Sequence, residues 1–541
     1  MAVGVPSESP AIIIKEVDLT GGVPNVQSTT GGYAGKFRWG PVGKATKISK
    51  ETELASTFGA PDDTHTADFH SAAYFLKYSN ALQVVRTLGD SSSNATAGLN
   101  VGSYDSADFI KNADHWEGLS GLSNWVAKYP GDIGNSLKYV VINNSGWAAA
   151  NATWKAEFDG QPNTGEVHVL VVDEDGVITG TSNSALERFA YLSTTSTATN
   201  ADGSTNYAKS VINDRSEYLW YNGSSFADAS DSASLAWGRS TYNSPVSEAL
   251  AGFDKFEDKD TIELDFLIAP GMSNSTDQRT VVNDLVTTAS STRKDCVVVT
   301  SPSSASVVNN NTPVTNTVTE AGGYTYTSYL VVDNNWLKVY DKYNDKYINI
   351  PAASSTAGIM AASDANTAPW YSPAGARRGA YLGITNLAYT PTKAERDTLY
   401  KAGINPVANL PGQGVLLFGD KTHMNRPSAF DRINVRRLFL VIERAIALAA
   451  RNTMFEFNDE FTRAEFVSIV EPFLREVKGR RGITDFRVVC DTTNNTPAVI
   501  DRNEFVANIF IKPARSINYI TLNFVAVRTG VDFEEVAGIQ V

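Results

Sequence analysis

The sequence has few of the side chains that carry catalysis or hold metals. Five histidines and two cysteines occur in 541 residues. The histidines are scattered and lack the spacing of zinc ligands; they are His65, His70, His115, His168 and His423. A G-x-S-x-G elbow, a Walker loop and an H-E-x-x-H motif are all missing. We therefore expect a protein that is not an enzyme, with no catalytic residues, no cofactor and no metal site.

Both cysteines lie in apolar runs of strand-like composition. Cys296 begins the run CVVVT, and Cys490 ends the run FRVVC. Cysteines in such surroundings usually serve as small buried hydrophobic residues, and two isolated ones do not indicate a disulfide framework. We therefore predict that both are buried thiols rather than nucleophiles.

Long apolar runs and an excess of positive charge are also missing. No run approaches the roughly 18 apolar residues of a membrane span, so we expect no membrane insertion. The formal net charge is −13, whereas nucleic-acid-binding proteins usually present a basic surface, so we expect no direct nucleic-acid partner. The first residues, MAVGVPSESPAIII, lack the basic n-region of a signal peptide. We therefore expect the protein to be cytoplasmic when it is made.

The length predicts two to four domains, and shifts in composition along the chain indicate where they lie. Residues 25–88 and 253–390 contain apolar strands and helical spacing, in an order typical of a parallel α/β domain. Residues 89–252 have polar loops and short strand-like runs, which indicate an inserted β-rich domain. Residues 391–541 contain three predicted helices followed by strands, an α+β pattern, and residues 1–24 are a separate N-terminal segment with one short apolar run. The predicted fold class is therefore a multidomain mixture of α/β and α+β.

Two β-rich apolar runs stand close to the end of the chain, at 505–511 and 517–527. Little sequence follows the second run, so we expect the last strand to lie near a sheet edge. An uncovered edge presents unpaired backbone N–H and C=O groups that can pair with another chain. Such an edge is a hazard for a monomeric enzyme, and it is useful to a protein that polymerises.

The segment that contains these runs, residues 484–536, resembles the C-terminal domain of contractile tail sheath proteins, above all those of T4-like bacteriophages. The resemblance extends through four more segments, which are AGKFRWGP at 34–41, YDKYND at 340–345, SPAG at 372–375 and FDRINVRRLF at 430–439. These segments are ordered and spread over most of the chain. The sequence is therefore identified as a member of the contractile tail sheath family.

The resemblance implies a function, a set of partners and a layout. It implies a structural subunit of a virion tail that polymerises as stacked sixfold rings around a tail tube and contracts to drive the tube through the host cell envelope. The implied partners are further copies of the chain, the tail tube protein, and the baseplate and tail terminator proteins, with assembly in the host cytoplasm. Residues 1–24 and 391–541 are expected innermost, with the α/β domain outside them and residues 89–252 on the outer surface.

One departure from T4-like sheaths concerns the outer domain. Those proteins carry a sizeable protruding domain just after the segment that matches LQVVRTLGD, here residues 82–90. In this chain the segment YPGDIGN, residues 129–135, follows after a short polar stretch. We therefore expect the protrusion to be reduced or missing.

A helix predicted at about 432–451 carries a candidate basic stripe. Arg437, Arg444 and Arg451 are seven positions apart, so they share one face of the helix. A solvated face is the ordinary interpretation of such a pattern. In the family that the chain resembles, the C-terminal domain lines the inner wall of the sheath, which favours a stripe that faces acidic residues of the tail tube.

The resemblance also gives a role to the two ends of the chain. In that family, arms from neighbouring subunits complete a sheet in a third subunit by strand addition. The arm residues predicted here are Ala11, Ile12, Ile13, Ile14, Thr529, Gly530, Val531, Asp532 and Phe533. The alternative is that both segments are ordinary edge strands of their own domain.

Three other functions remain open at this point. The sheath of a phage-derived tailocin, or of another contractile injection system, has the same chemistry and differs in its genome context. A secreted β-rich adhesin fits the Ser/Thr-rich segments, but the missing export signal argues against it. A hydrolase requires a reactive serine or cysteine, and labelling of Cys296 or Cys490 by an activity-based probe would favour it.

Overall fold

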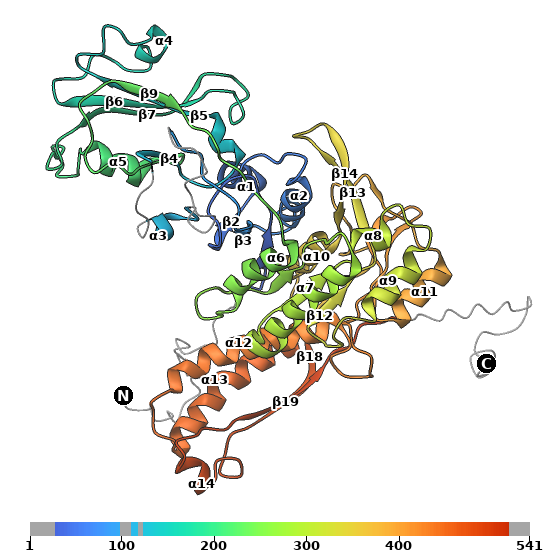
Figure 1. Cartoon of the computed structure of the whole chain (residues 1–541). Coiled ribbons are helices and arrows are strands. Elements are labelled where there is room, and N and C mark those ends of the chain that lie inside the picture. Colours follow the sequence, from blue (N-terminus) through green and yellow to red (C-terminus); the bar gives the residue numbers. More distant parts are fainter. Residues whose placement is uncertain (1–27, 98–109, 117–122, 519–541) are drawn as a thin grey trace, which may run out of the picture.

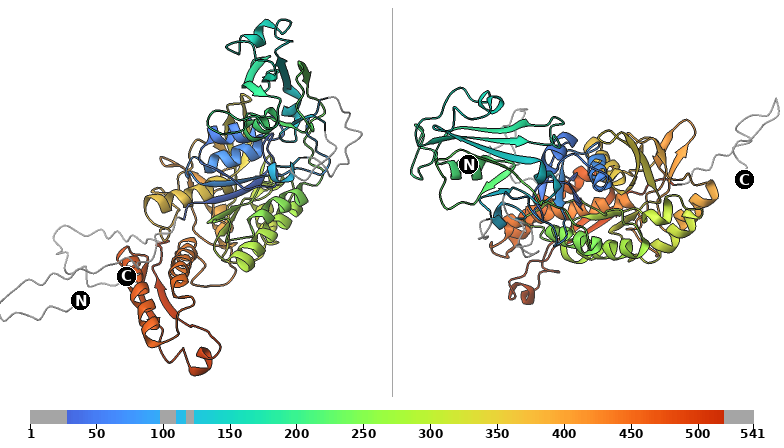
Figure 2. Two further views of the ribbon diagram at one scale, coloured as in Figure 1. Left: turned by 90° about the vertical axis from the view of Figure 1, so that its left-hand side faces the viewer. Right: turned by 45° about the horizontal axis from the view of Figure 1, so that its top comes forward.

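The computed structural model describes residues 28–97, 110–116 and 123–518. The predicted arm residues at 11–14 and 529–533 lie outside these ranges. The described chain contains an α/β region, a β-rich region and a C-terminal region of two long helices and a hairpin (Figure 1). The β-rich and C-terminal regions lie at opposite ends of the molecule, with the α/β region between them (Figure 2).

A six-stranded sheet in the order β12-β11-β10-β1-β3-β2 forms the centre of the α/β region. Five strands run parallel, and they are β1 (Gly31–Gly35), β3 (Leu82–Arg86), β10 (Phe266–Ile268), β11 (Val297–Thr300) and β12 (Leu330–Val332). Strand β2 (Thr46–Ile48) closes one edge, antiparallel to β3. The sheet therefore unites strands from two parts of the sequence that residues 89–252 separate.

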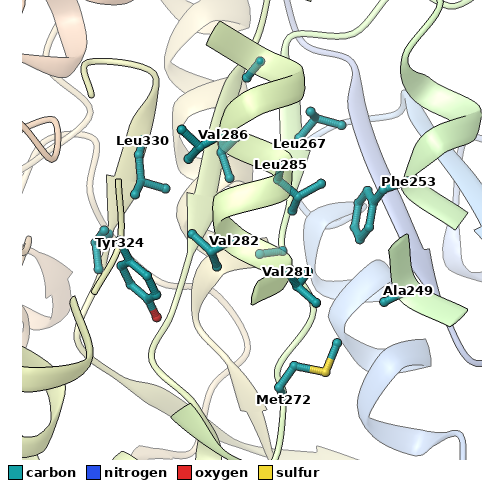
Figure 3. Close-up of a cluster of buried hydrophobic side chains, with 14 of the residues drawn as sticks. Ala249, Phe253, Leu267, Met272, Val281, Val282, Leu285, Val286, Tyr324 and Leu330 are labelled. Atoms are coloured by element: carbon teal, nitrogen blue, oxygen red, sulfur yellow. The ribbon is translucent and has the colours of Figure 1, made fainter. Parts of the chain in front are cut away.

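Helices cover both faces of this sheet, and alternate strand residues face each layer. Leu267 and Leu330 pack with Val281 and Leu285 of α7 (Figure 3). Their neighbours in sequence, such as Ile268, pack against the other layer. The first layer contains α6 (Pro245–Phe253), α7 (Ser275–Thr287) and α9 (Pro313–Ala321), and the second contains α1 (Glu51–Phe58), α2 (Thr66–Phe75) and α10 (Ala353–Asn366). Because both faces are buried, the strands are mostly apolar, as those of parallel sheets usually are.

Smaller elements complete the α/β region. A three-stranded antiparallel sheet has the order β14-β13-β15, with β13 (Trp336–Asp341), β14 (Lys346–Pro351) and β15 (Asn386–Leu387), and β16 (Val407–Leu410) pairs with β17 (Gly414–Leu417). The remaining helices are η3 (Asp254–Phe256), the π-helical turn η4 (Thr288–Arg293), α8 (Ser304–Val307) and α11 (Lys393–Lys401). Leu399 and Ile404 belong to the same buried cluster as α7. The start of the predicted C-terminal domain, residues 391–423, thus packs with the α/β region, because its apolar side chains face that core.

The β-rich region has its own antiparallel sheet, in the order β7-β6-β5-β9. Its strands are β5 (Leu137–Asn143), β6 (Glu166–Asp173), β7 (Ser184–Ser193) and β9 (Asp231–Ser234), and β4 (Trp125–Ala127) pairs separately with β8 (Leu219–Tyr221). Four short helices accompany them, namely α3 (Ala113–Trp116), η2 (Asp132–Ser136), α4 (Ala152–Lys155) and α5 (Ala208–Arg215). Val169 and Leu170 of β6 face two different buried clusters. This region is therefore packed on both sides of its sheet.

The C-terminal region is built on α12 (Ile433–Ala450) and α13 (Glu460–Gly479). The antiparallel strands β18 (Ile483–Val489) and β19 (Asn508–Pro513) follow, with η5 (Arg451–Thr453) and α14 (Pro497–Ile500) in the connections. Ile433 and Leu440 of α12 pack against the α/β core, whereas Leu438 and Ile442 pack against α13. Helix α12 therefore belongs to two cores at once.

Three findings concern the cysteines, membrane spans and metal sites that the sequence analysis considered. Cys296 and Cys490 are both free and buried, which confirms that they are buried thiols. Among the helices of the described ranges, none is both long enough and apolar enough to cross a membrane. In the same ranges, no group of three or more His, Cys, Asp or Glu side chains is placed to hold a metal ion.

Candidate assembly surface

Arg437, the first arginine of the predicted stripe, points into the protein. Its side chain is 5% exposed and pairs with Asp364 of α10, which is 1% exposed. The guanidinium lies 4.5 Å from the ring centre of Phe266 and donates to the Met360 carbonyl oxygen at 3.1 Å. A side chain enclosed in this way cannot face a tail tube, so the prediction for Arg437 is wrong.

The other two arginines of the stripe differ from each other. Arg444 is 17% exposed and donates to Asp265 Oδ1 at 2.7 Å and to the Leu264 carbonyl oxygen at 2.7 Å. Arg451 is 67% exposed, with a guanidinium nitrogen 3.7 Å from Asp260. The seven-residue spacing placed the arginines on one side of α12, but it did not predict that this side meets buried carboxylates. Of the three, only Arg451 remains available on the surface.

Arg436, which the stripe did not include, is also an internal contact. Its guanidinium lies 4.3 Å from the ring centre of Tyr329 and 4.2 Å from that of Phe430. It donates to Ser328 Oγ through Nη2 at 2.6 Å. The signal in the sequence was an arginine pair inside the apolar helix of the segment FDRINVRRLF, since arginines in such surroundings are usually paired or stacked. Helix α12 is therefore bonded to the α/β region near its start, by Arg436 and Arg437, and again about two turns later, by Arg444.

The hairpin of β18 and β19 presents two open edges. Phe486 pairs with Ile511 and Val488 with Ile509, and these four side chains are half-buried against the cluster under α13. Phe510 points away from that cluster and is exposed. Among the residues that the structure describes, no third strand pairs with either strand. Each outer edge therefore has backbone groups available to another strand.

The connection between α12 and α13 carries a patch of exposed aromatic side chains. Phe455 is 101% exposed, Phe457 is 83% exposed and Phe461 is 75% exposed. Phe455 has a φ of 72°, a left-handed conformation that is rare for an aromatic residue. Sequence reasoning missed this patch, although the run MFEFNDEF places four hydrophobic residues among acidic ones. Exposed apolar patches often mark interaction sites.

The described chain begins and ends beside α12. Ser28 accepts from Arg437 Nη2 through its carbonyl oxygen at 3.1 Å and donates its hydroxyl to Asp364 at 2.9 Å. At the other end, Ser516 donates its hydroxyl to Asp420 at 2.7 Å, and Asp420 pairs with Arg432, the residue before α12, at 3.0 Å. Both ends of the described chain are therefore fixed close to α12.

Comparisons with known proteins agree with this architecture. A family model described as the phage tail sheath protein central domain matches residues 245–423, and one described as the phage tail sheath C-terminal domain matches residues 425–526. The tail sheath protein of Enterobacteria phage T4 is 31% identical, and the comparison covers 98% of this chain and 99% of that protein. This chain belongs to the phage tail sheath family. Members of that family are structural proteins of the tail.

Solved structures of other sheath proteins share the fold. The sheath tail protein Lin1278 of Listeria innocua has a TM-score of 0.57 at 14% identity, over 91% of this chain and 94% of that one. The helical sheath of the anti-feeding prophage, solved in its contracted state, has a TM-score of 0.54 at 13% identity, over 96% and 99%. These likenesses support the mixed α and β architecture of the tail sheath protein described here.

The comparisons also bear on where the tail sheath domains meet. The two family models adjoin between residues 423 and 425. Residues 391–423 fall within the central-domain match, as their packing with the α/β core suggests. The alignment with the T4 protein spans 664 positions, whereas this chain has 541 residues, so the T4 protein contains segments that this chain lacks.

Proposed function

We propose that this tail sheath protein polymerises as stacked sixfold rings around a tail tube and contracts to drive the tube through the envelope of a host cell. Its proposed partners are further copies of itself, the tail tube protein, and the baseplate and tail terminator proteins, in a virion assembled in the host cytoplasm. Contacts that repeat from subunit to subunit without closing generate a helical assembly. The observation that carries the proposal is the hairpin β18–β19, whose outer edges pair with no other strand of the described residues.

The proposed link between subunits is strand addition at that hairpin. Residues 11–14 and 529–533 would supply the strands, and main-chain hydrogen bonds would give affinity. Phe510 and the other exposed side chains of β19 would fix the register of the added strand, because alternate side chains of a strand face opposite sides of the sheet. An ordinary edge strand of the same subunit is the competing interpretation.

The proposed inner surface includes the C-terminal region. Arg451 and the aromatic patch at 455–461 are exposed at one end of α12. An exposed ion pair contributes roughly 0–1 kcal/mol, so contacts of this type hold subunits in register only in large numbers and separate readily. Such contacts suit a sheath that has to move along its tube. The β-rich region, at the opposite end of the molecule, would then form the outer surface, with a protrusion smaller than in T4-like relatives.

Contraction is proposed to move each subunit largely as one body. The bonds from Arg436, Arg437 and Arg444 fasten α12 to the α/β region, and Leu438 and Ile442 fasten α13 to α12. Subunits joined through their arms can then rotate and shift outward while their cores stay intact. A difference of a few kcal/mol between two packings of the same sequence is sufficient to favour one of them.

Removal of residues 529–541 tests the proposed links. We expect the shortened chain to stay folded, with unchanged circular dichroism, and to sediment as a monomer under conditions in which the full chain forms polymers. The full chain carrying Glu257→Gln, an exposed change outside the C-terminal region, serves as the control and should polymerise normally. Normal polymers from the shortened chain would refute the shared-strand proposal.

A further inference from the structure

A cavity of about 1020 Å³ lies between α11, the start of β18 and the end of the described chain. Its lining contains six basic side chains from separate parts of the sequence, which are Arg378, Lys393, Arg396, Lys478, Arg481 and Arg515. Two acidic residues, Asp397 and Asp420, share the lining. The cavity is therefore strongly positive in a protein whose formal net charge is −13.

Most of this positive charge is not neutralised within the subunit. Among the residues that the structure describes, Lys478 is the one lining cation with an ion pair, to Asp485 at 3.2 Å. Asp420 is already occupied, because it pairs with Arg432 and accepts from Ser516 and Ser372. Charges of one sign that line a concave surface raise the local concentration of ligands of the opposite sign. The cavity is therefore suited to an anionic ligand.

The same cavity has an apolar part. Trp370, Phe418 and Ile517 line it, and Phe418 and Ile517 are 50% and 81% exposed. Arg396 lies 5.9 Å from the ring centre of Phe418, so the charged and apolar surfaces adjoin. A small inorganic anion would leave this apolar surface uncovered. A peptide that combines carboxylates with an aromatic side chain would cover both parts.

Such a peptide occurs in this chain. Residues 531–536 read Val-Asp-Phe-Glu-Glu-Val, with three carboxylates around Phe533. We propose that the cavity binds residues 532–535 of a second copy of the chain. This inference rests on the proposed function. It adds side-chain recognition to an arm that strand addition alone would hold only through its backbone. The aromatic ring meets Trp370 and Phe418, and the carboxylates meet the cations at the rim.

The donor is a second copy because of where the chain leaves the cavity. Residues 514–518 form part of the lining, and the sequence predicts an extended run over 517–527. Ten extended residues span about 33 Å. An arm of that length is long enough to reach the cavity of a neighbouring copy. In an extended strand Asp532 and Glu534 face one side and Phe533 and Glu535 face the other, and a one-residue slip would exchange the two sides, so the cavity also selects the register.

Peptide binding tests the recognition. The receptor is the full chain with its own carboxylates neutralised by Asp532→Asn, Glu534→Gln and Glu535→Gln, and the probe is a fluorescent peptide of residues 529–541. We expect saturable binding that weakens as NaCl is raised, because salt screens exposed charges. Arg481→Glu with Arg515→Glu should lower the affinity at least tenfold, and Lys47→Glu on the distant strand β2 should not change it. Equal affinity after reversal in the cavity, or equal binding of a peptide with three amides, would overturn the proposal.

Mixing of full chains tests whether the donor is a second copy. One chain carries Arg481→Glu and Arg515→Glu, and the other carries Glu534→Arg and Glu535→Arg. We expect each alone to polymerise poorly and an equimolar mixture to recover, since each cavity then meets an arm of opposite charge. A mixture no better than its components would show that the arm binds within its own chain and would overturn the proposal. If wild-type and both variant chains polymerise equally, the cavity is not a docking site and the sheath function stands.

Discussion

Arg437 and Asp364 form a buried ion pair between α12 and α10, 73 positions apart in the sequence. The same two side chains hold Ser28, from which the N-terminal segment continues. The guanidinium also covers the ring of Phe266 in the central sheet. One contact thus connects the C-terminal region, the α/β core and the start of the proposed N-terminal arm. A force on that arm would be transmitted to α12 through this ion pair.

Breaking this pair should strongly destabilise the fold. Removal of one partner of a buried pair leaves the other charge without compensation, which typically lowers the free energy of unfolding by about 3–5 kcal/mol. We expect an effect of this size for Arg437→Ala in urea unfolding followed by circular dichroism. Arg451→Ala is the matched control on the same helix, and because Arg451 is exposed we expect a change within about 0.5 kcal/mol. Equal effects of the two substitutions would contradict the assignment of Arg437 to the interior.

The aromatic patch should act in association rather than in folding. Phe455 and Phe457 make little contact with their own subunit, so replacing both by Ser should leave the free energy of unfolding unchanged within about 0.5 kcal/mol. We expect polymer formation, measured by light scattering, to need a higher protein concentration. Trp237→Ser, which removes an exposed aromatic residue from the β-rich region, is the control. If the control impairs polymerisation as much as the double variant does, the patch has no particular role.

Asp333 should make stability depend on pH. It is buried at the end of β12 and accepts from Ser301 and Thr356, and burial raises the pKa of its carboxyl to about 7. An unfolded aspartate has a pKa of about 3.9, so between these values the folded state binds a proton that the unfolded state does not. This carboxyl therefore makes the free energy of unfolding rise as pH falls from about 7 to 4, by up to about 1.4 kcal/mol per unit.

The measurement for Asp333 compares unfolding curves at pH 7 and pH 5. We expect Asp333→Asn to remove this contribution, so that the variant gains less stability than the wild type on acidification. Glu257→Gln, at an exposed position, should follow the wild type. Parallel pH dependence of the wild type and Asp333→Asn would mean that the carboxyl stays ionised in the folded protein.

Sequence patterns that depend only on neighbouring residues predicted much of this fold. The apolar strands at 262–269 and 296–300 indicated a buried parallel sheet, because only strands covered on both faces lack polar alternation. Cys296 and Cys490 were predicted as buried thiols from the apolar runs around them, and they are buried. The family was evident from ordered segments that reach from residue 34 to residue 536.

Features that depend on distant partners were not predictable in the same way. The spacing of Arg437, Arg444 and Arg451 fixed a helix face, but whether that face meets solvent depends on Asp364 and Asp265, which lie far away in sequence. The packing of residues 391–423 with the α/β core depends on which core the apolar side of α11 faces. Helical periodicity contains no information about that choice.

Negative-stain electron microscopy of the purified chain, alone and mixed with its tail tubes, tests the central claim most directly. A sheath subunit with open hairpin edges and exchangeable arms should form hollow striated cylinders, or a striated coat on the tubes. Monodisperse particles under every condition would mean that the hairpin edges are covered within each subunit, and they would contradict the account.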